Sequence, residues 1–152
     1  MNRHLPNWRS LLYVPASEER FVAKAHERGA DAIILDLEDG VAPDSKARAR
    51  AGLAAAAASA RQNGADIVVR INRPLRMAAE DIAAAAAAGA DGVICTKMMG
   101  ADHVRLLSEL AAESELAAGR EIGSLRFIVL IEDAAALRQA DAADRALGHV
   151  VC

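Results

Sequence analysis

The chain has 152 residues and a mass of 15.9 kDa, long enough for one domain with a sizeable core but too short for two. Hydrophobic residues make up 53% of it and aromatic residues only 3%, so its core must be built from aliphatic side chains and closely packed helices. The formal charge of −3 comes from scattered acids and bases, which excludes the basic stripe that a nucleic-acid partner requires. No apolar stretch approaches the roughly 20 uncharged residues of a membrane span, so we expect no membrane partner.

The first residues and the cysteines indicate the compartment. Residues 1–6 lack the apolar core of a signal peptide. Cys95 and Cys152 show no CxxC or metal-ligand spacing, and Cys95 lies in an apolar run that is typical of a buried free thiol. We therefore expect a soluble cytoplasmic protein with reduced thiols.

Short β-prone runs alternate with helix-like segments along the chain. This alternation predicts βαβ units and a parallel sheet. The expected strands are Leu11–Val14, Ala32–Leu37, Ile67–Ile71, Gly92–Thr96, Phe127–Ile131 and, more weakly, Leu147–Val151. The expected helices are Glu18–Arg28, Ser45–Gln62, Ala79–Ala88, Ala101–Ala117 and Ala134–Ala140.

A Gly-Ala-Asp repeat supports this arrangement. It occurs at residues 29–31, 64–66 and 89–91, each time after a helical pattern and before a strand. Glycine at such a position adopts the left-handed conformation that ends a helix, so each copy predicts a loop from helix to strand. Ser17 is predicted to cap the first helix, and Pro43-Asp44-Ser45 to start the second.

The run Ile33–Val41 (IILDLEDGV) carries the strongest functional signal. By strand alternation Asp36 and Glu38 point to one face, from the end of an otherwise apolar strand. Two such carboxylates need a cation or a shared proton. For Asp36 two interpretations stay open, a buried ion pair with Arg70 and a place in a binding site; for Glu38 and Asp39 the site is favoured.

The next strand ends in Arg70 and Asn72, which alternation places on one face. A guanidinium at this position can grip a carboxylate or a developing enolate through two hydrogen bonds. A structural role for Arg70 is the alternative. Because several carboxylates surround it, we predict an anion-binding floor, with Asp36 and Arg70 in the substrate-binding set.

The fourth and fifth strands end in Lys97 and Glu132. In α/β barrels and doubly wound sheets, sites lie at such carboxyl ends. Glu132 suits a hard cation, although Mg²⁺ needs one or two carboxylates with water and substrate, and a helix N-terminal partner is the alternative. For Lys97 an ion pair with the carboxylates is favoured over a Schiff base.

Four blocks of the sequence carry a family resemblance. They are Arg9–Ala16 followed by Arg20, Gly29–Pro43 followed by Lys46 and Arg50, Val69–Asn72, and Leu130–Glu132. Their order and spacing resemble the citrate lyase β-subunit-like family, grouped with the HpcH/HpaI aldolases of the phosphoenolpyruvate/pyruvate barrel superfamily.

The resemblance implies a Mg²⁺-dependent carbon–carbon lyase that acts on a 3-hydroxy carboxylate or its coenzyme A thioester, of the citryl-CoA or malyl-CoA type. It implies an α/β fold, the N-terminal part of a (β/α)₈ TIM barrel with about six β/α units. Arg70 matches the substrate-binding and catalytic arginine, Glu132 the first metal-ligating carboxylate, Glu38 and Asp39 the catalytic acids around the metal's water shell, and Arg20 a residue near the entering substrate.

The same resemblance implies an incomplete domain over residues 1–152. Relatives continue into a segment that supplies the second metal ligand, which is missing from this chain. We therefore expect little or no lyase activity from the chain alone, and self-association as a homo-oligomer, because apolar barrel residues would otherwise be exposed.

Other interpretations stay open. The chain could be a non-catalytic remnant, or a subunit that assembles only with another chain. A flavodoxin-like or receiver-like domain would suit the length, but the first strand is not followed by a glycine-rich phosphate loop. The use of coenzyme A is also open, with Lys46 or the Arg50 region as candidates for binding its phosphates.

Overall fold

The computed structural model describes residues 6–147 as a single parallel sheet with helices packed along it. The five strands lie in chain order β1-β2-β3-β4-β5, which is the order in which a β/α barrel is wound. The strands are β1 (Leu11–Pro15), β2 (Ala32–Asp36), β3 (Asp66–Ile71), β4 (Gly92–Cys95) and β5 (Arg126–Val129). All five were predicted, and the α/β fold with an incomplete barrel is confirmed.

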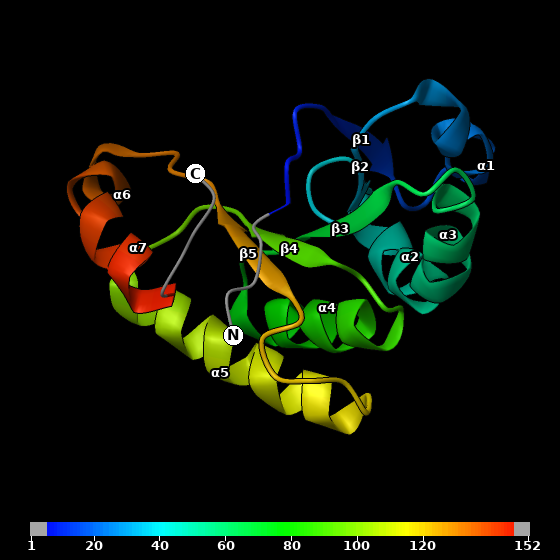
Figure 1. The fold of residues 1–152 in the computed structure, drawn as a ribbon. Coiled ribbons are helices and arrows are strands. Elements are labelled where there is room, and N and C mark those ends of the chain that lie inside the picture. Colours follow the sequence, from blue (N-terminus) through cyan, green and yellow to red (C-terminus); the bar gives the residue numbers. More distant parts are fainter. Residues whose placement is uncertain (1–5, 148–152) are drawn as a thin grey trace.

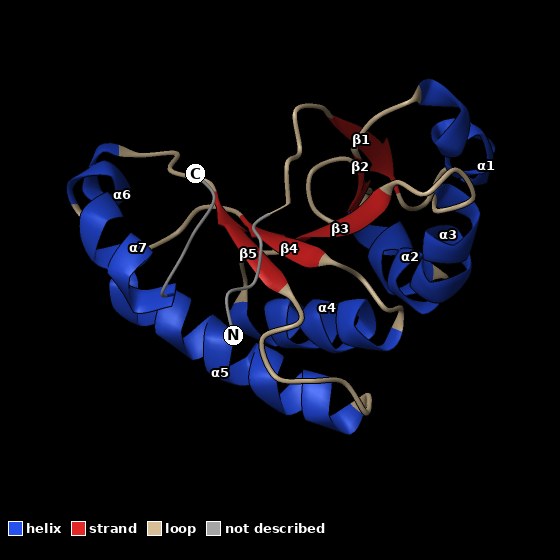
Figure 2. Cartoon of the chain, in the orientation of Figure 1, coloured by secondary structure: helices blue, strands red, loops and turns tan. Residues whose placement is uncertain are grey.

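Helices follow each strand, and those after the first four strands cover the outer side of the curved sheet, whereas α6 and α7 lie beyond the end of β5, with α7 against α5 (Figure 1). Figure 2 shows α4 and α5 side by side beneath β4 and β5, with α1, α2 and α3 beside the first strands. The helices are α1 (Glu19–Ala25), α2 (Lys46–Ala51), α3 (Leu53–Ala60), α4 (Leu75–Ala87), α5 (Ala101–Ala117), α6 (Ala134–Arg138) and α7 (Ala140–Leu147), with short 3₁₀ turns η1 (His26–Arg28) and η2 (Pro43–Ser45).

The alternation of strand side chains creates two apolar layers. On the helix side, residues such as Ile33, Leu35 and Val69 join the main core with the buried faces of α1–α5. On the other face, Ile34 and Val68 belong to a smaller cluster that includes Ala32, Ile94, Trp8, Ile128 and Leu130. Parallel strands buried on both sides are expected to be apolar, and the fully buried strands β2 and β4 are apolar apart from Asp36 at the end of β2.

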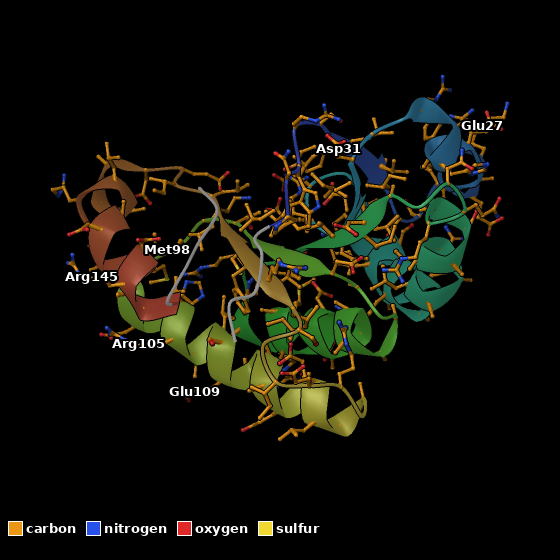
Figure 3. All side chains as sticks on the ribbon, in the orientation of Figure 1. Glu27, Asp31, Met98, Arg105, Glu109 and Arg145 are labelled. Carbon is orange, nitrogen blue, oxygen red and sulfur yellow. The ribbon has the colours of Figure 1, made fainter. Side chains whose placement is uncertain are left out.

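A third cluster joins the last helices to the sheet. Met98 is fully buried and belongs to one apolar cluster with Val104 of α5, Ala143 of α7 and Val129 of β5. Figure 3 shows Met98 inside this corner, whereas Arg105 and Arg145 point outward from α5 and α7. The cluster fixes the chain segment that follows β5.

The three Gly-Ala-Asp copies end helical segments as predicted. Gly29, Gly64 and Gly89 have φ values of 69°, 81° and 69°, in the left-handed region that favours glycine. The following aspartates then tie adjacent strands at their amino ends. Asp31 accepts hydrogen bonds from the residues before β1, and Asp91 from the Ile67 backbone N–H.

Several predicted boundaries were wrong. Neither Ser17 nor Ser45 caps a helix with its side chain: α1 starts after Glu18, and Pro43–Ser45 forms a 3₁₀ turn. The second predicted helix divides at Gly52, which the alanine-rich pattern does not reveal. The last predicted helix, Ala134–Ala140, ends at Arg138, and α7 was not predicted. The weak sixth strand, Leu147–Val151, lies outside the described residues except for Leu147, which ends α7.

No helix within residues 6–147 is long and apolar enough to cross a membrane.

Candidate active site

The site is organised around a two-point ion pair between neighbouring strands. Asp36 and Arg70 are opposite each other in the register of β2 and β3. Arg70 Nε donates to Asp36 Oδ1 at 2.7 Å, and Arg70 Nη2 donates to Asp36 Oδ2 at 2.6 Å. Parallel strands in this register bring the two side chains to the same face and the same end of the sheet.

Asp36 also folds the loop that follows it. Its Oδ1 accepts the backbone N–H of Glu38 at 2.8 Å, and its Oδ2 accepts that of Gly40 at 2.8 Å. A side chain at position 40 would collide with Asp36 Oδ2, so the close approach requires glycine. Both Asp36 oxygens are thereby engaged by the protein. Asp36 thus forms the predicted ion pair with Arg70 and also anchors the loop that follows β2.

A line of contacts continues from Arg70 across the sheet. Arg70 Nη1 lies 3.2 Å from Glu38 Oε2, and the other Glu38 oxygen accepts from Lys97 Nζ. Lys97 Nζ is also 3.3 Å from Asp39 Oδ2, and the Lys97 backbone N–H donates to Glu132 Oε2 at 2.5 Å. The strand-end residues predicted to converge therefore do so.

Lys97 holds this line together from an unusual backbone conformation. Its φ is 51°, the only positive φ of a non-glycine residue among the described residues. This turn directs its N–H toward Glu132 while its side chain reaches Glu38 and Asp39. Its hydrogen bond to Glu38 raises the pKa of Lys97, and its hydrogen bond to Asp39 lowers the pKa of that carboxyl. A protonated amine in ion pairs supports the ion-pair interpretation over a Schiff base.

Tyr13 covers the Arg70 guanidinium from β1. The guanidinium carbon lies 5.1 Å from the ring centre, within range of a cation–π contact. Burial raises the pKa of Tyr13, with the Arg70 charge opposing that shift. The ring and the paired carboxylates leave the Arg70 side chain only 16% exposed.

A second polar network contacts the loop of residues 37–40 that follows β2, which we call the acidic loop. Lys46 Nζ donates to the Leu37 and Glu38 carbonyl oxygens and to Asn72 Oδ1. Asn72 in turn donates its backbone and side-chain N–H groups to Asp81 Oδ2. Asn72 was predicted to share a face with Arg70, but β3 ends at Ile71, so alternation ends there and Asn72 turns toward α4.

Arg50 completes this network. Its Nε donates to Asp81 Oδ1 at 2.7 Å and its Nη1 to Glu80 Oε2 at 2.7 Å. Lys46 is likewise engaged by three protein oxygens. Both cations are therefore paired with protein oxygens, and a role for them in binding coenzyme A phosphates stays a suggestion.

Arg20 lies apart from this cluster. It is largely exposed on α1, 3.8 Å from Glu18 and stacked over Phe21 at 4.5 Å. With Tyr13 it lines a cavity of about 570 Å³ between β1 and α1. Arg20 and Arg70 therefore share Tyr13 as a neighbour.

Glu132 provides one exposed carboxylate at the end of β5. No group of three His, Cys, Asp or Glu side chains within residues 6–147 is arranged to hold a metal ion. A hydrated Mg²⁺ uses one or two carboxylates with water and substrate oxygens, so Glu132 fits as a single protein ligand of that kind.

Sequence reasoning missed the buried network because Asp81 looks like an ordinary polar residue of a helix. One signal was available. Ala78, Ile82 and Ala85 form the buried stripe of α4, and Asp81 falls inside it with no exposed surface. An acid within an apolar stripe needs a partner from another element.

Comparison with known proteins agrees with the fold. The HpcH/HpaI aldolase/citrate lyase family matches residues 9–151. A (3S)-malyl-CoA thioesterase of Cereibacter sphaeroides is 37% identical over 110 residues, which are 72% of this chain and 39% of the relative. Citrate lyase subunit beta of Leuconostoc mesenteroides is 32% identical over 145 residues, covering 92% of this chain and 48% of the relative.

A solved malate synthase of Haloferax volcanii superposes with a TM-score of 0.78 at 17% identity, over 94% of this chain and 47% of the other. That likeness concerns the fold. This chain spans about half the length of the relatives it matches or less. With the family match over almost its whole length, the chain belongs to the HpcH/HpaI aldolase/citrate lyase family.

Proposed function

We propose that this site binds the carboxylate of a small 2-oxo acid and takes part in making or breaking a carbon–carbon bond beside it. The substrate would be a 3-hydroxy carboxylate or its coenzyme A thioester. The observation that supports this proposal most strongly is the position of the Arg70 guanidinium, which Asp36 and Glu38 hold at the carboxyl ends of parallel strands. Its five N–H groups exceed the three contacts to these acids, which leaves donors for a substrate oxygen.

Each site residue has a role in this proposal. Arg70 holds the carboxylate or the enolate, whose negative charge is stabilised by a donor already fixed in place. Asp36 orients Arg70, because its own oxygens are engaged. Glu38 and Asp39, which lie against Lys97, position water or move a proton near the reacting carbons. Arg20 guides the incoming substrate from the neighbouring cavity.

Mg²⁺ is the proposed cofactor, and Glu132 the residue of this chain that would hold it. When bound, the ion would polarise the 2-oxo group and stabilise negative charge on the enolate oxygen. The Lys97 N–H contact holds the Glu132 carboxylate at the strand end, close to the acids of the β2 loop. The family resemblance implies that a second protein ligand comes from a segment that follows in relatives, and within residues 6–147 no group of three His, Cys, Asp or Glu side chains is arranged to hold the ion.

Thioester hydrolysis is the second candidate, since relatives at 36–37% identity are named (3S)-malyl-CoA thioesterases. The two reactions differ in their products. A lyase yields a 2-oxo acid and an acyl thioester, whereas a thioesterase releases free coenzyme A and the hydroxy acid. A non-catalytic subunit that assembles with itself or another chain would yield neither.

The test is a product assay with malyl-CoA and citryl-CoA, with and without Mg²⁺. Free thiol and 2-oxo acid are measured in parallel for the 152-residue chain and for any longer product of its gene. We expect Mg²⁺-dependent release of 2-oxo acid by the longer product, little or none by the 152-residue chain, and a loss of about 10²–10³-fold in Arg70→Ala. Thiol release without 2-oxo acid would identify the thioesterase, and an unaffected Arg70→Ala variant would refute the site.

Sedimentation of the same samples tests assembly. We propose that the chain is cytoplasmic and forms homo-oligomers. The reason for the second proposal is that β1 pairs only with β2 within the described residues, which leaves one edge of β1 open to another chain. A monomer at all concentrations would contradict this.

A further inference from the structure

We propose that Lys46 is a positioning residue of the site, which fixes the backbone of the acidic loop, and that buried Asp81 holds Lys46 in that role through Asn72. Neither Lys46 nor Asp81 touches the carboxylates of Asp36, Glu38 or Asp39. The proposal concerns how those carboxylates acquire their orientation.

The first step is the hydrogen-bonding capacity of Lys46. An ammonium group has three N–H donors. Lys46 Nζ lies 2.9 Å from the Leu37 oxygen, 2.6 Å from the Glu38 oxygen and 2.6 Å from Asn72 Oδ1. All three donors are thereby used on uncharged oxygens, two of which belong to the backbone between Asp36 and Gly40.

The second step is the orientation of the Asn72 amide. Asn72 Nδ2 donates to the Leu37 oxygen at 2.8 Å and to Asp81 Oδ2 at 2.7 Å. A flipped amide would place its oxygen against both of these acceptors, which is unfavourable. Asp81 and the Leu37 carbonyl therefore force Asn72 Oδ1 to face Lys46.

The third step is the anchoring of Asp81 itself. Its carboxylate has no exposed surface, and it accepts from the Asn72 backbone N–H at 2.8 Å as well as from Arg50 Nε at 2.7 Å. A buried carboxylate with this many donors has one orientation. Asp81 of α4 thus orients Asn72, Asn72 orients Lys46, and Lys46 holds the loop.

The consequence reaches the proposed catalytic groups. The backbone N–H groups of Glu38 and Gly40 donate to Asp36, so the same loop that Lys46 grips also completes the Asp36–Arg70 pair. If Lys46 loses its contacts, the Leu37 and Glu38 carbonyls lose a charged donor, and the Glu38 and Gly40 amides should exchange faster.

Amide hydrogen exchange of the 152-residue protein tests the positioning directly. In Lys46→Met and in Asp81→Asn we expect exchange at Glu38 and Gly40 to accelerate by about tenfold to hundredfold, as loss of a charge-assisted hydrogen bond implies. Val69, in the core of β3, should keep its protection. Lys24→Met, the same change at an exposed position of α1, and Asp102→Asn, at an exposed position of α5, serve as matched controls.

Two results would overturn the proposal. Unchanged protection at Glu38 and Gly40 in Lys46→Met would show that the loop does not depend on Lys46. An equal loss at Val69 would show a general effect on stability. If Lys46→Met does not fold, Asn72→Ser, which keeps the backbone N–H to Asp81 but removes the amide, carries the same prediction.

A measurement of pyruvate binding tests whether the Lys46–Asn72–Asp81 network affects the site. Only this binding test rests on the proposed function. Pyruvate binding with Mg²⁺ should weaken at least about tenfold in Lys46→Met and remain unchanged in Arg145→Met, which removes an exposed cation of α7 far from the site. If the unsubstituted protein does not bind pyruvate, the proposed function fails and the exchange result still decides the positioning role. If binding is equal in Lys46→Met while exchange accelerates, the network shapes the loop but not the ligand site, and the proposal fails in that part.

Discussion

Arg70 and Asp36 are paired both as register neighbours in the sheet and as side chains, through hydrogen bonds of 2.7 Å and 2.6 Å. Asp36 is 3% exposed, so it depends on this guanidinium for its charge compensation. The pair therefore contributes to stability and to the proposed site at once, and the two effects can be separated.

Arg70→Ala should lower the free energy of unfolding by about 3–5 kcal/mol, because it leaves a buried carboxylate without its cation. Arg9→Ala is the matched control. Arg9 pairs with Asp31 at 3.1 Å but is 77% exposed, so solvent screens the pair and we expect a much smaller loss. Urea denaturation measures both, and similar losses in the two variants would contradict the buried-pair argument.

Gly40→Ala should destabilise the loop between β2 and η2, because the added methyl group would meet Asp36 Oδ2 and the Gly40 hydrogen bond would have to lengthen. We expect a loss of about 1–3 kcal/mol, typical of overpacking. Gly52→Ala is the control, since its methyl group would meet only ordinary contacts of 3.6 Å or more. Thermal unfolding compares them, and a Gly40→Ala variant as stable as Gly52→Ala would show that the loop adapts.

The strand order and the Asp36–Arg70 pair could be predicted from the sequence, because both depend on local sequence patterns. Apolar runs alternate with helical segments, and parallel strands place consecutive strand ends together. Ion pairing of Lys97 followed from the same reasoning. Its positive φ and its backbone contact to Glu132 did not, since they depend on how β4 and β5 are placed.

What escaped prediction depends on contacts between distant segments. The hydrogen bonds of Asp81 come from Asn72 and Arg50, which lie nine and 31 residues away. The division of the second helix at Gly52 also has no local cause that alanine-rich flanks reveal. One general signal emerges, an acid inside the apolar stripe of a helix, and it applies again at Glu115.

Glu115 closes the loop that leads from α5 into β5. It is 1% exposed, and its carboxylate accepts from Gly123 N at 2.6 Å, Ser124 Oγ at 3.1 Å and Leu125 N at 2.5 Å. Glu115→Ala should cost about 3 kcal/mol or more, because buried donors lose their acceptor. Exposed Glu113→Ala on the same helix should change the free energy of unfolding by under about 0.5 kcal/mol. Equal stabilities in a urea titration would refute this role.

Cys95 should be chemically inert in the folded protein. It is 2% exposed on β4, and burial raises its pKa to about 12, so the reactive thiolate is scarce at neutral pH. In a Cys152→Ser background, alkylation followed by mass spectrometry should show no adduct at pH 7.5 until denaturant is added. Stoichiometric labelling of the native protein would mean that β4 opens readily.

The Asp31 carboxylate gives a pH dependence with a defined sign. Hydrogen bonds from the Arg9 side chain and then the Arg9 backbone lower its pKa from 3.8 to about 2, and Ser10 adds further donors. Since the pKa is lower in the folded than in the unfolded state, the stabilisation is fully present above about pH 4. It is lost as the pH falls from about 4 to about 2. Asp31→Asn should thus be less stable than the unsubstituted protein at pH 6, and the difference should shrink through this window.

Direct titration checks the same residue. The Asp31 carboxyl carbon, followed by NMR, should titrate with a midpoint near 2 in the unsubstituted protein. In Arg9→Ala the midpoint should rise toward 3.8 without reaching it, because the backbone N–H groups of residues 9 and 10 still donate. A midpoint near 3.8 in the folded, unsubstituted protein would show that Asp31 does not hold the segment before β1 as the structure indicates.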